Sequence, residues 1–271
     1  MDIGVIVNIA KGNVDNSIKS VRDFGFDCCQ LNCWDMTVLT EEFASEVKAA
    51  LDKYNVKVTT FWCGWEGPRA WNFYEGALTL GLVPATYRYT RMNNLKRGSM
   101  FAKMLGVDKI ATHVGFIPEN PNDENYRELV VALRDVVSFC RANGQSFLFE
   151  TGQETPVTLL RTIEDIELDN VGINLDPANL ILYGKGNPID ALDVFGKYVM
   201  DVHAKDGFYP TNGKKLGREV KVGEGKVNFP EFIKKLREVG YNGSLIIERE
   251  ISGPQQAEDI KETKIYLESL I

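Results

Sequence analysis

Short runs of apolar, mostly β-branched residues recur along the chain, and stretches with helical periodicity separate them. Short runs that are apolar at nearly every position are typical of strands buried on both faces of a parallel sheet. Successive runs start 25 to 53 residues apart, so each gap can hold at least one helix. The pattern predicts eight strands, at residues 3–8, 28–33, 56–62, 109–113, 146–150, 171–176, 199–203 and 244–248.

The segments between these strands carry helix signals. Thr155-Pro156 and Asn187-Pro188 each place an N-cap residue type before a proline at the first helical position. Four glycines follow helical runs and precede strands, as a left-handed C-terminal cap would: Gly25, Gly106, Gly144 and Gly240. The chain is therefore expected to alternate strand and helix eight times.

Eight strand–helix units without a linker predict one closed (β/α)8 TIM barrel, formed as a single domain by residues 1–271. An open doubly wound sheet is disfavoured, because the first strand is followed by Asn8-Ile9-Ala10-Lys11-Gly12 rather than by a GxGxxG loop. The long segment from Gly64 to about Thr90 is rich in aromatic residues. Two interpretations of it stay open: a lid over the barrel mouth, or extra packing around the rim.

Charge and cysteine content narrow the class of protein. The 271 residues carry 31 Lys and Arg against 38 Asp and Glu, a net charge of −7, which argues against binding to nucleic acid. The five cysteines include no CxxC pair and predict reduced thiols. The start has no basic segment and no stretch reaches ~20 apolar residues, so we expect a soluble cytoplasmic protein that binds no membrane. The sequence leaves open whether copies assemble into a homo-oligomer.

Ionisable residues end the last four predicted strands. Glu150, Asp176, His203 and Glu248 each follow an apolar run. Active sites of such barrels lie at the carboxyl ends of the strands, so we expect these side chains to meet there. Three carboxylates meeting in one place repel one another unless a cation neutralises them. The pattern predicts one divalent metal ion, and the ligand types favour Mn²⁺, Mg²⁺, Co²⁺ or Zn²⁺.

Other residues near the strand ends are candidates for substrate binding, each with a structural alternative. His113 ends the fourth predicted strand and either touches substrate or bonds the backbone. Lys205 follows His203 by two positions and so faces the same side of an extended segment. Gln153 follows the fifth strand and is a candidate for binding a hydroxyl. Trp62, with Trp65 and Phe116, either forms an apolar wall of the substrate site or packs at the rim.

At the level of motifs, the chain resembles the xylose isomerase-like barrel superfamily, in the sugar-phosphate isomerase/epimerase group that includes the ketose 3-epimerases. The motifs that carry the resemblance are Phe149-Glu150, Asn174-Leu175-Asp176-Pro177-Ala178-Asn179-Leu180, Val202-His203-Ala204-Lys205-Asp206, Val222-Gly223-Glu224-Gly225-Lys226-Val227-Asn228-Phe229 and Ile247-Glu248. The N-terminal half matches only in its alternation of strands and helices and in His113-Val114-Gly115.

This resemblance implies a mononuclear metal held by Glu150, Asp176, His203 and Glu248, with the two glutamates as catalytic acid/base groups on opposite faces of a sugar or sugar phosphate. Asn179 and Tyr209 stand where family epimerases carry a substrate-binding histidine and an arginine. Asn179 is therefore a candidate substrate contact.

The chemistry that such a site suits is removal of a proton next to a carbonyl, with the metal stabilising the developing enediolate. An isomerase or epimerase is the leading prediction, and a dehydratase acting on a sugar or inositol derivative is the alternative. Two further classes are disfavoured. An abasic-site endonuclease of this superfamily would need three zinc ions, and the chain has only two histidines. A non-catalytic sugar-binding barrel would have no need of the metal pocket.

Overall fold

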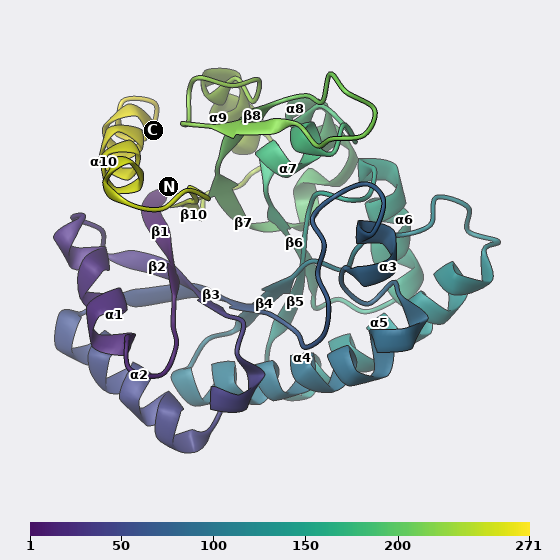
Figure 1. Cartoon of the computed structure of the whole chain (residues 1–271), viewed down its shortest axis with the longest axis horizontal. Helices are drawn as coiled ribbons and strands as arrows, with labels where there is room; N and C mark the ends of the chain where they lie inside the picture. The colour runs from purple at the N-terminus through teal and green to yellow at the C-terminus, as the bar shows by residue number, and fades with distance from the viewer.

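The computed structural model describes all 271 residues and contains a closed barrel of eight parallel strands. The ring order is β1-β10-β7-β6-β5-β4-β3-β2, and it closes because β1 pairs with both β2 and β10 (Figure 1). This confirms the predicted fold class. The strands are β1 (Asp2–Asn8), β2 (Cys28–Cys33), β3 (Lys57–Cys63), β4 (Lys109–Thr112), β5 (Ser146–Glu150), β6 (Val171–Leu175), β7 (Val199–Ala204) and β10 (Ser244–Ile247).

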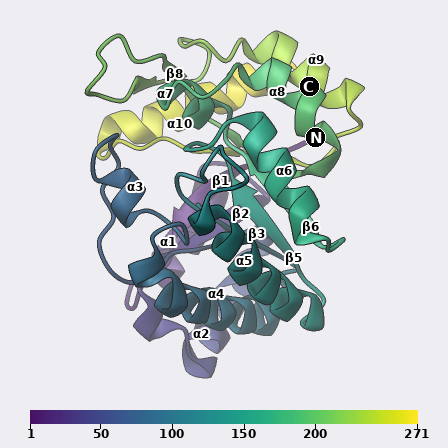
Figure 2. The same cartoon turned by 90° about the vertical axis from the view of Figure 1, so that its right-hand side faces the viewer.

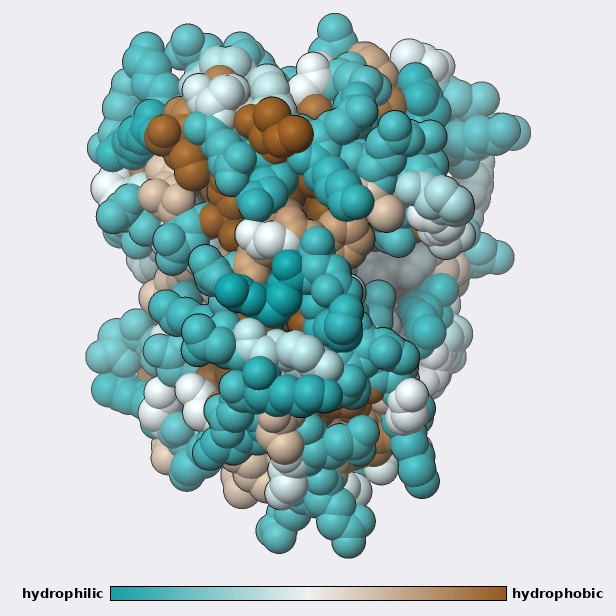
Figure 3. All heavy atoms as spheres, turned by 90° about the vertical axis from the view of Figure 1, so that its left-hand side faces the viewer, coloured by the Kyte–Doolittle hydropathy of each residue, from teal (hydrophilic) through white to brown (hydrophobic).

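Helices surround the barrel, and α4, α5 and α6 lie side by side on one flank (Figure 2). The opposite flank, with α1, α2 and α10, presents a largely hydrophilic surface broken by small apolar patches (Figure 3). The helices are α1 (Val14–Asp23), α2 (Glu41–Tyr54), α3 (Gly76–Thr79), α4 (Ala85–Leu105), α5 (Glu124–Ala142), α6 (Pro156–Ile166), α7 (Pro177–Leu182), α8 (Pro188–Phe195), α9 (Phe229–Glu238) and α10 (Pro254–Glu268), with 3-10 turns at Met36–Val38 and Gly196–Tyr198. No helix combines the length and apolar character needed to cross a bilayer.

The residues predicted to begin and end helices have these roles in the structure. Thr155 and Asn187 cap α6 and α8, because their side-chain oxygens accept hydrogen bonds from backbone N–H groups of the first turn. The four glycines all adopt a positive φ, between 73° and 84°, a backbone conformation that glycine reaches without a Cβ clash. Local sequence therefore fixes where helices end and where the chain turns back to the barrel.

The apolar core lies inside the barrel and between its strands and the helices. Most of it is one large cluster that draws on every strand of the ring, and a small second cluster is centred on Trp62 and Trp65. All five cysteines are buried and form no disulfide, which confirms the prediction of free thiols. Burial raises the pKa of each thiol, that of Cys28 to about 11.

A two-stranded antiparallel ribbon was missed by the sequence analysis. Strands β8 (Asp206–Phe208) and β9 (Arg218–Val220) pair in the loop between β7 and α9. The Asp206 carboxylate anchors this loop, because it accepts hydrogen bonds of 3.0 to 3.1 Å from the amides of Gly223, Gly225 and Val227. A Cβ on Gly225 would lie 2.1 Å from Asp206 Oδ1, so only glycine fits there.

The aromatic segment after β3 combines both interpretations that the sequence left open. Residues 64–84 form a loop that carries α3, and α4 already begins at Ala85. Trp71 from this loop is 40% exposed and lines the central cavity, whereas Trp65 is buried. Part of the segment therefore covers the mouth and part packs at the rim.

Candidate active site

Four neighbouring elements of the ring bring the predicted ligands together. Glu150 is the last residue of β5, and His203 lies in β7. Asp176 and Glu248 lie one residue beyond β6 and β10, so these two predicted strands were one residue too long. Asp176 is also the N-cap of α7, where its Oδ1 accepts the Asn179 N–H at 2.9 Å. The other oxygen, Oδ2, stays available to the site.

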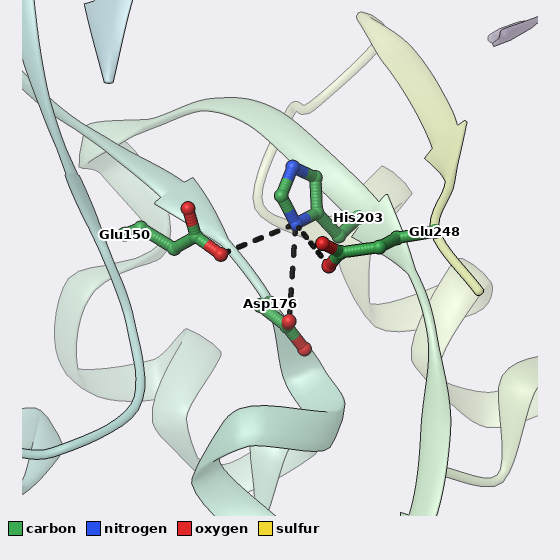
Figure 4. A group of neighbouring side chains, drawn as sticks. All are labelled: Glu150, Asp176, His203 and Glu248. Carbon is green, nitrogen blue, oxygen red and sulfur yellow. Dashed lines mark ion pairs between the residues drawn. The ribbon is translucent and has the colours of Figure 1, made fainter. Parts of the chain in front are cut away.

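The four side chains converge on the Nδ1 atom of His203 (Figure 4). This nitrogen lies 3.4 Å from Glu150 Oε1, 3.8 Å from Asp176 Oδ2 and 3.1 Å from Glu248 Oε2. One donor atom from each residue falls within 4.8 Å of all the others. Asp176 and His203 are fully buried, and Glu150 is 3% exposed. This is a compact set of four donors at the mouth of the barrel.

A polar layer beneath the site orients His203. Gln30 Oε1, from β2, lies 2.7 Å from His203 Nε2. An amide oxygen only accepts hydrogen bonds, so Nε2 donates to it and Nδ1 faces the carboxylates, where it can hold either a proton or a metal ion. The Gln30 amide group in turn donates to Asn174 Oδ1 at 3.2 Å. Sequence reasoning missed Gln30, although a glutamine inside an otherwise apolar buried strand is itself a signal.

Lys205 is the cation within the cluster. Its Nζ, 1% exposed, lies 3.2 Å from Glu248 Oε2, 3.4 Å from Asp176 Oδ2 and 3.1 Å from Glu250 Oε2. Burial opposes the charge of Lys205, but the carboxylates outweigh it and raise its pKa well above the usual value. It therefore stays protonated. A single lysine leaves several negative charges in the cluster uncompensated.

The pKa values of the cluster shift in the directions that favour its ion pairs. Burial works against the charged form of His203, yet Glu150 and Glu248 raise its pKa well above the usual value. Burial also opposes ionisation of Glu248, but Lys205 and His203 lower its pKa below the usual range. Burial also opposes ionisation of Glu150, but His113 and His203 outweigh it and lower the Glu150 pKa. Both glutamates are therefore ionised at neutral pH.

Two buried atoms of the cluster have no hydrogen-bond partner, His203 Nδ1 and Asp176 Oδ2. Buried polar atoms are rarely left in this state, and both point to the centre of the four donors. A divalent ion would satisfy both atoms and balance the carboxylates. The residues present therefore fit a metal site of one imidazole and three carboxylates, a ligand set that suits Mn²⁺, Mg²⁺, Co²⁺ or Zn²⁺.

A cavity of about 420 Å³ opens above this cluster. Glu150 and Glu248 lie at its base, and three of the chain's four tryptophans contribute to its wall. The wall is continuous, because Trp34 packs on Trp62 at 4.8 Å and on Trp71 at 6.4 Å between ring centroids. The cavity therefore has carboxylates at its bottom and tryptophan rings along one side.

Four of the five predicted substrate contacts line this cavity: Trp62, His113, Gln153 and Asn179. Trp62 Nε1 also donates a hydrogen bond to Glu150 Oε2, and His113 Nε2 lies 3.4 Å from Glu150 Oε1. Both side chains therefore position Glu150. Lys205, the fifth, lies behind Glu248 and 3.5 Å from Asn179 Oδ1. His113 follows β4 rather than ending it.

Gln153 has a missed neighbour in Tyr183. The two amide atoms of Gln153 and the hydroxyl of Tyr183 are buried without a hydrogen-bond partner, and both residues line the cavity. Trp65 and Phe116 do not line it: Trp65 packs behind Trp62, and Phe116 packs on Tyr183 at 5.7 Å. Gln153 and Tyr183 can thus meet polar groups of a ligand.

Two further residues of the β7–α9 loop, Tyr209 and Arg218, make contacts elsewhere. Tyr209 donates a hydrogen bond to the Gly186 carbonyl at 3.2 Å. Arg218 stacks on Phe208, with Cζ 5.3 Å from the ring centroid. Neither residue lines the cavity.

Comparisons with known proteins agree with this architecture. A crystal structure of a xylose isomerase domain protein from Planctomyces limnophilus is 36% identical and superposes with a TM-score of 0.93, covering 99% of this chain and 96% of that one. A D-tagatose 3-epimerase-like protein, 23% identical, superposes with a TM-score of 0.75 over 100% of this chain and 98% of its own. The latter likeness shows the fold.

Sequence comparison extends the relationship. The uncharacterised protein MJ1311 of Methanocaldococcus jannaschii is 30% identical over 253 residues, which cover 87% of this chain and 79% of that protein. The family model described as xylose isomerase-like TIM barrel matches residues 18–270. The chain belongs to the xylose isomerase-like TIM barrel family.

Proposed function

We propose that this protein is a metal-dependent isomerase or epimerase that acts on a sugar by removing a proton next to its carbonyl group. The observation that carries the proposal is the convergence of Glu150 and Glu248 on one buried centre with Asp176 and His203 between them. The epimerase-like relative supports a sugar as the substrate. A bound divalent ion would supply Lewis-acid stabilisation of the negative charge that develops on the substrate oxygens.

The two glutamates are placed to serve different faces of a substrate. Strands β5 and β10 lie three positions apart in the ring, and β6 and β7 lie between them. Each carboxylate is held ionised by neighbouring charges, so each can accept a proton at neutral pH. An epimerase needs one group to remove a proton from one face and another to return it to the opposite face.

The carboxylates of Glu150 and Glu248 have different neighbours. Trp62 and His113 fix the orientation of Glu150. Lys205 Nζ lies 3.2 Å from Glu248 and stabilises its charge. Gln153 and Tyr183 offer buried donors and acceptors for sugar hydroxyls, and the tryptophan wall offers an apolar surface for C–H groups of a sugar ring.

The test is hydrogen exchange from solvent D₂O into free and phosphorylated ketoses, measured by NMR with and without added Mn²⁺. Exchange reports proton removal whether the product is an epimer, an isomer or a dehydrated sugar. Glu150→Gln and Glu248→Gln should each lower the exchange rate by about 10²–10⁴-fold, because an amide cannot act as the base. The effect should depend on which epimer is supplied.

The control is Glu262→Gln, since Glu262 is a half-exposed residue that pairs with Lys221 on the outer surface. It should exchange at the wild-type rate. Full exchange in both site variants would refute the two-base mechanism. Metal-independent exchange, or no exchange with any ketose, would refute the proposed function.

A further inference from the structure

Arg69 is a cation that faces the cavity without an anionic partner. It lies on the loop between β3 and α4, and its guanidinium stacks on the Trp34 ring with Cζ 4.2 Å from the ring centroid. Both residues line the cavity that contains Glu150 and Glu248. No hydrogen bond or ion pair of the structure involves the Arg69 side chain. Stacking holds the group in place while its N–H donors stay free.

The loop that carries Arg69 is fixed by a second arginine. Arg91 of α4 is 1% exposed and donates to the carbonyl oxygens of Pro68, Thr79 and Gly81 at 2.7 to 2.8 Å and of Glu66 at 3.1 Å. These four bonds tie both arms of the loop to one buried guanidinium. The position of Arg69 at the cavity is therefore set before any ligand arrives.

The other cation near the cavity serves a different purpose. Lys205 is surrounded by three carboxylates, whereas Arg69 has none. Strands β7 and β3, which precede these two residues, lie on opposite sides of the eight-membered ring. Carboxylates line the base of the cavity, whereas Arg69 offers an unpaired cation, so an anionic substituent that does not bind the metal is attracted to Arg69.

We propose that Arg69, held on Trp34, binds an anionic group of the substrate, a phosphate or a carboxylate remote from the carbon that exchanges its proton. A guanidinium presents paired N–H donors that match either group in a bidentate geometry. The inference rests on the proposed function for the orientation of the substrate. It makes Arg69 the residue that selects charged sugars over neutral ones.

The experiment measures binding of matched probes to the Mn²⁺-loaded protein by calorimetry: D-fructose, D-fructose 6-phosphate and D-fructuronate. Wild type should bind at least one charged probe more tightly than fructose. Arg69→Gln should weaken binding of that probe by about 10- to 100-fold, as expected for loss of charged hydrogen bonds, and leave fructose unchanged. Comparing the two charged probes shows whether phosphate or carboxylate is the preferred group.

The matched control is Arg218→Gln, because Arg218 is also exposed and stacked on an aromatic ring but lies outside the cavity. It should keep the wild-type preference. Equal binding of charged and neutral probes by wild type, or an unchanged preference in Arg69→Gln, would overturn the inference. Solvent exchange into fructose tests the proposed function separately, since it involves no anionic group.

Discussion

Replacing Lys205 with methionine should destabilise the protein strongly, and a divalent metal should reverse much of that loss. The substitution keeps an unbranched side chain of nearly the same length and removes its charge. Glu248, Glu250 and Asp176 then lose a cation that lies 3.1 to 3.4 Å from each of them. The variant therefore tests how much the charge of Lys205 contributes to the free energy of unfolding.

The magnitude follows from these distances. At an effective dielectric constant of ~20, a unit charge pair at about 3.2 Å contributes about 5 kcal/mol before desolvation is subtracted. Breaking a buried ion pair by removing one partner costs a net ~3–5 kcal/mol, since a buried charge is left uncompensated. We expect Lys205→Met to lower the free energy of unfolding by that amount without metal. With excess Mn²⁺ the difference from wild type should fall by at least about half, because the ion compensates the same carboxylates.

Urea unfolding followed by circular dichroism, with EDTA and with Mn²⁺, gives both differences. Lys185→Met is the matched control, because Lys185 is partly exposed and pairs with the exposed Glu119 at 3.8 Å, so it should contribute less than ~1 kcal/mol in either buffer. A Lys205→Met loss below ~1 kcal/mol, or one that Mn²⁺ does not change, would show that Lys205 and a metal do not neutralise the same charges.

Three further predictions concern single side chains. Gln30→Leu should lower metal affinity by about 10- to 100-fold in a chelator competition assay, because Nε2 of His203 loses the acceptor that fixes its tautomer; unchanged affinity would contradict this. His203→Ala should bind metal more weakly still and keep the far-UV spectrum of the barrel. Burial raises the pKa of Glu154 to about 7 from an ordinary 4.5, so the folded state holds this proton more tightly and stability falls as pH rises between these values. Glu154→Gln should remove that slope, worth about 3 kcal/mol, between urea titrations at about pH 5 and about pH 8.

The barrel and the four donors were predictable because each depends on local sequence. Buried parallel strands appear as apolar runs, and the residue that ends each run lies at the same rim of the barrel. The one-residue errors at Asp176 and Glu248 did not matter, since both side chains still point into the mouth from the strand ends. The prediction of the site therefore does not depend on exact strand boundaries.

The supporting residues were not predictable in the same way, because their partners are remote in sequence. Gln30 and His203 are separated by 173 positions, and Trp62 and Glu150 by 88. Arg69 gave no signal either, since a lone arginine in a loop is usually solvated. Its position depends on Trp34, which lies on another loop. These contacts come from closure of the ring rather than from any one segment.

The polar layer below the mouth shows why four donors at strand ends do not by themselves make a metal site. Thr59 and Thr60 donate to Asp201 Oδ2, which also lies 3.5 Å from the Gln30 amide group. That amide thereby has partners for its N–H groups and turns its oxygen to His203. In a barrel of this family with the same four donors but an aliphatic residue at the position of Gln30, Nε2 would keep only the Asn174 amide nitrogen, a donor 3.0 Å away, which favours the tautomer with the proton on Nδ1. Such a barrel should bind its metal more weakly. The interior residues of β2 and β3 therefore determine how tightly the donors at the ends of β5, β6, β7 and β10 bind a metal ion.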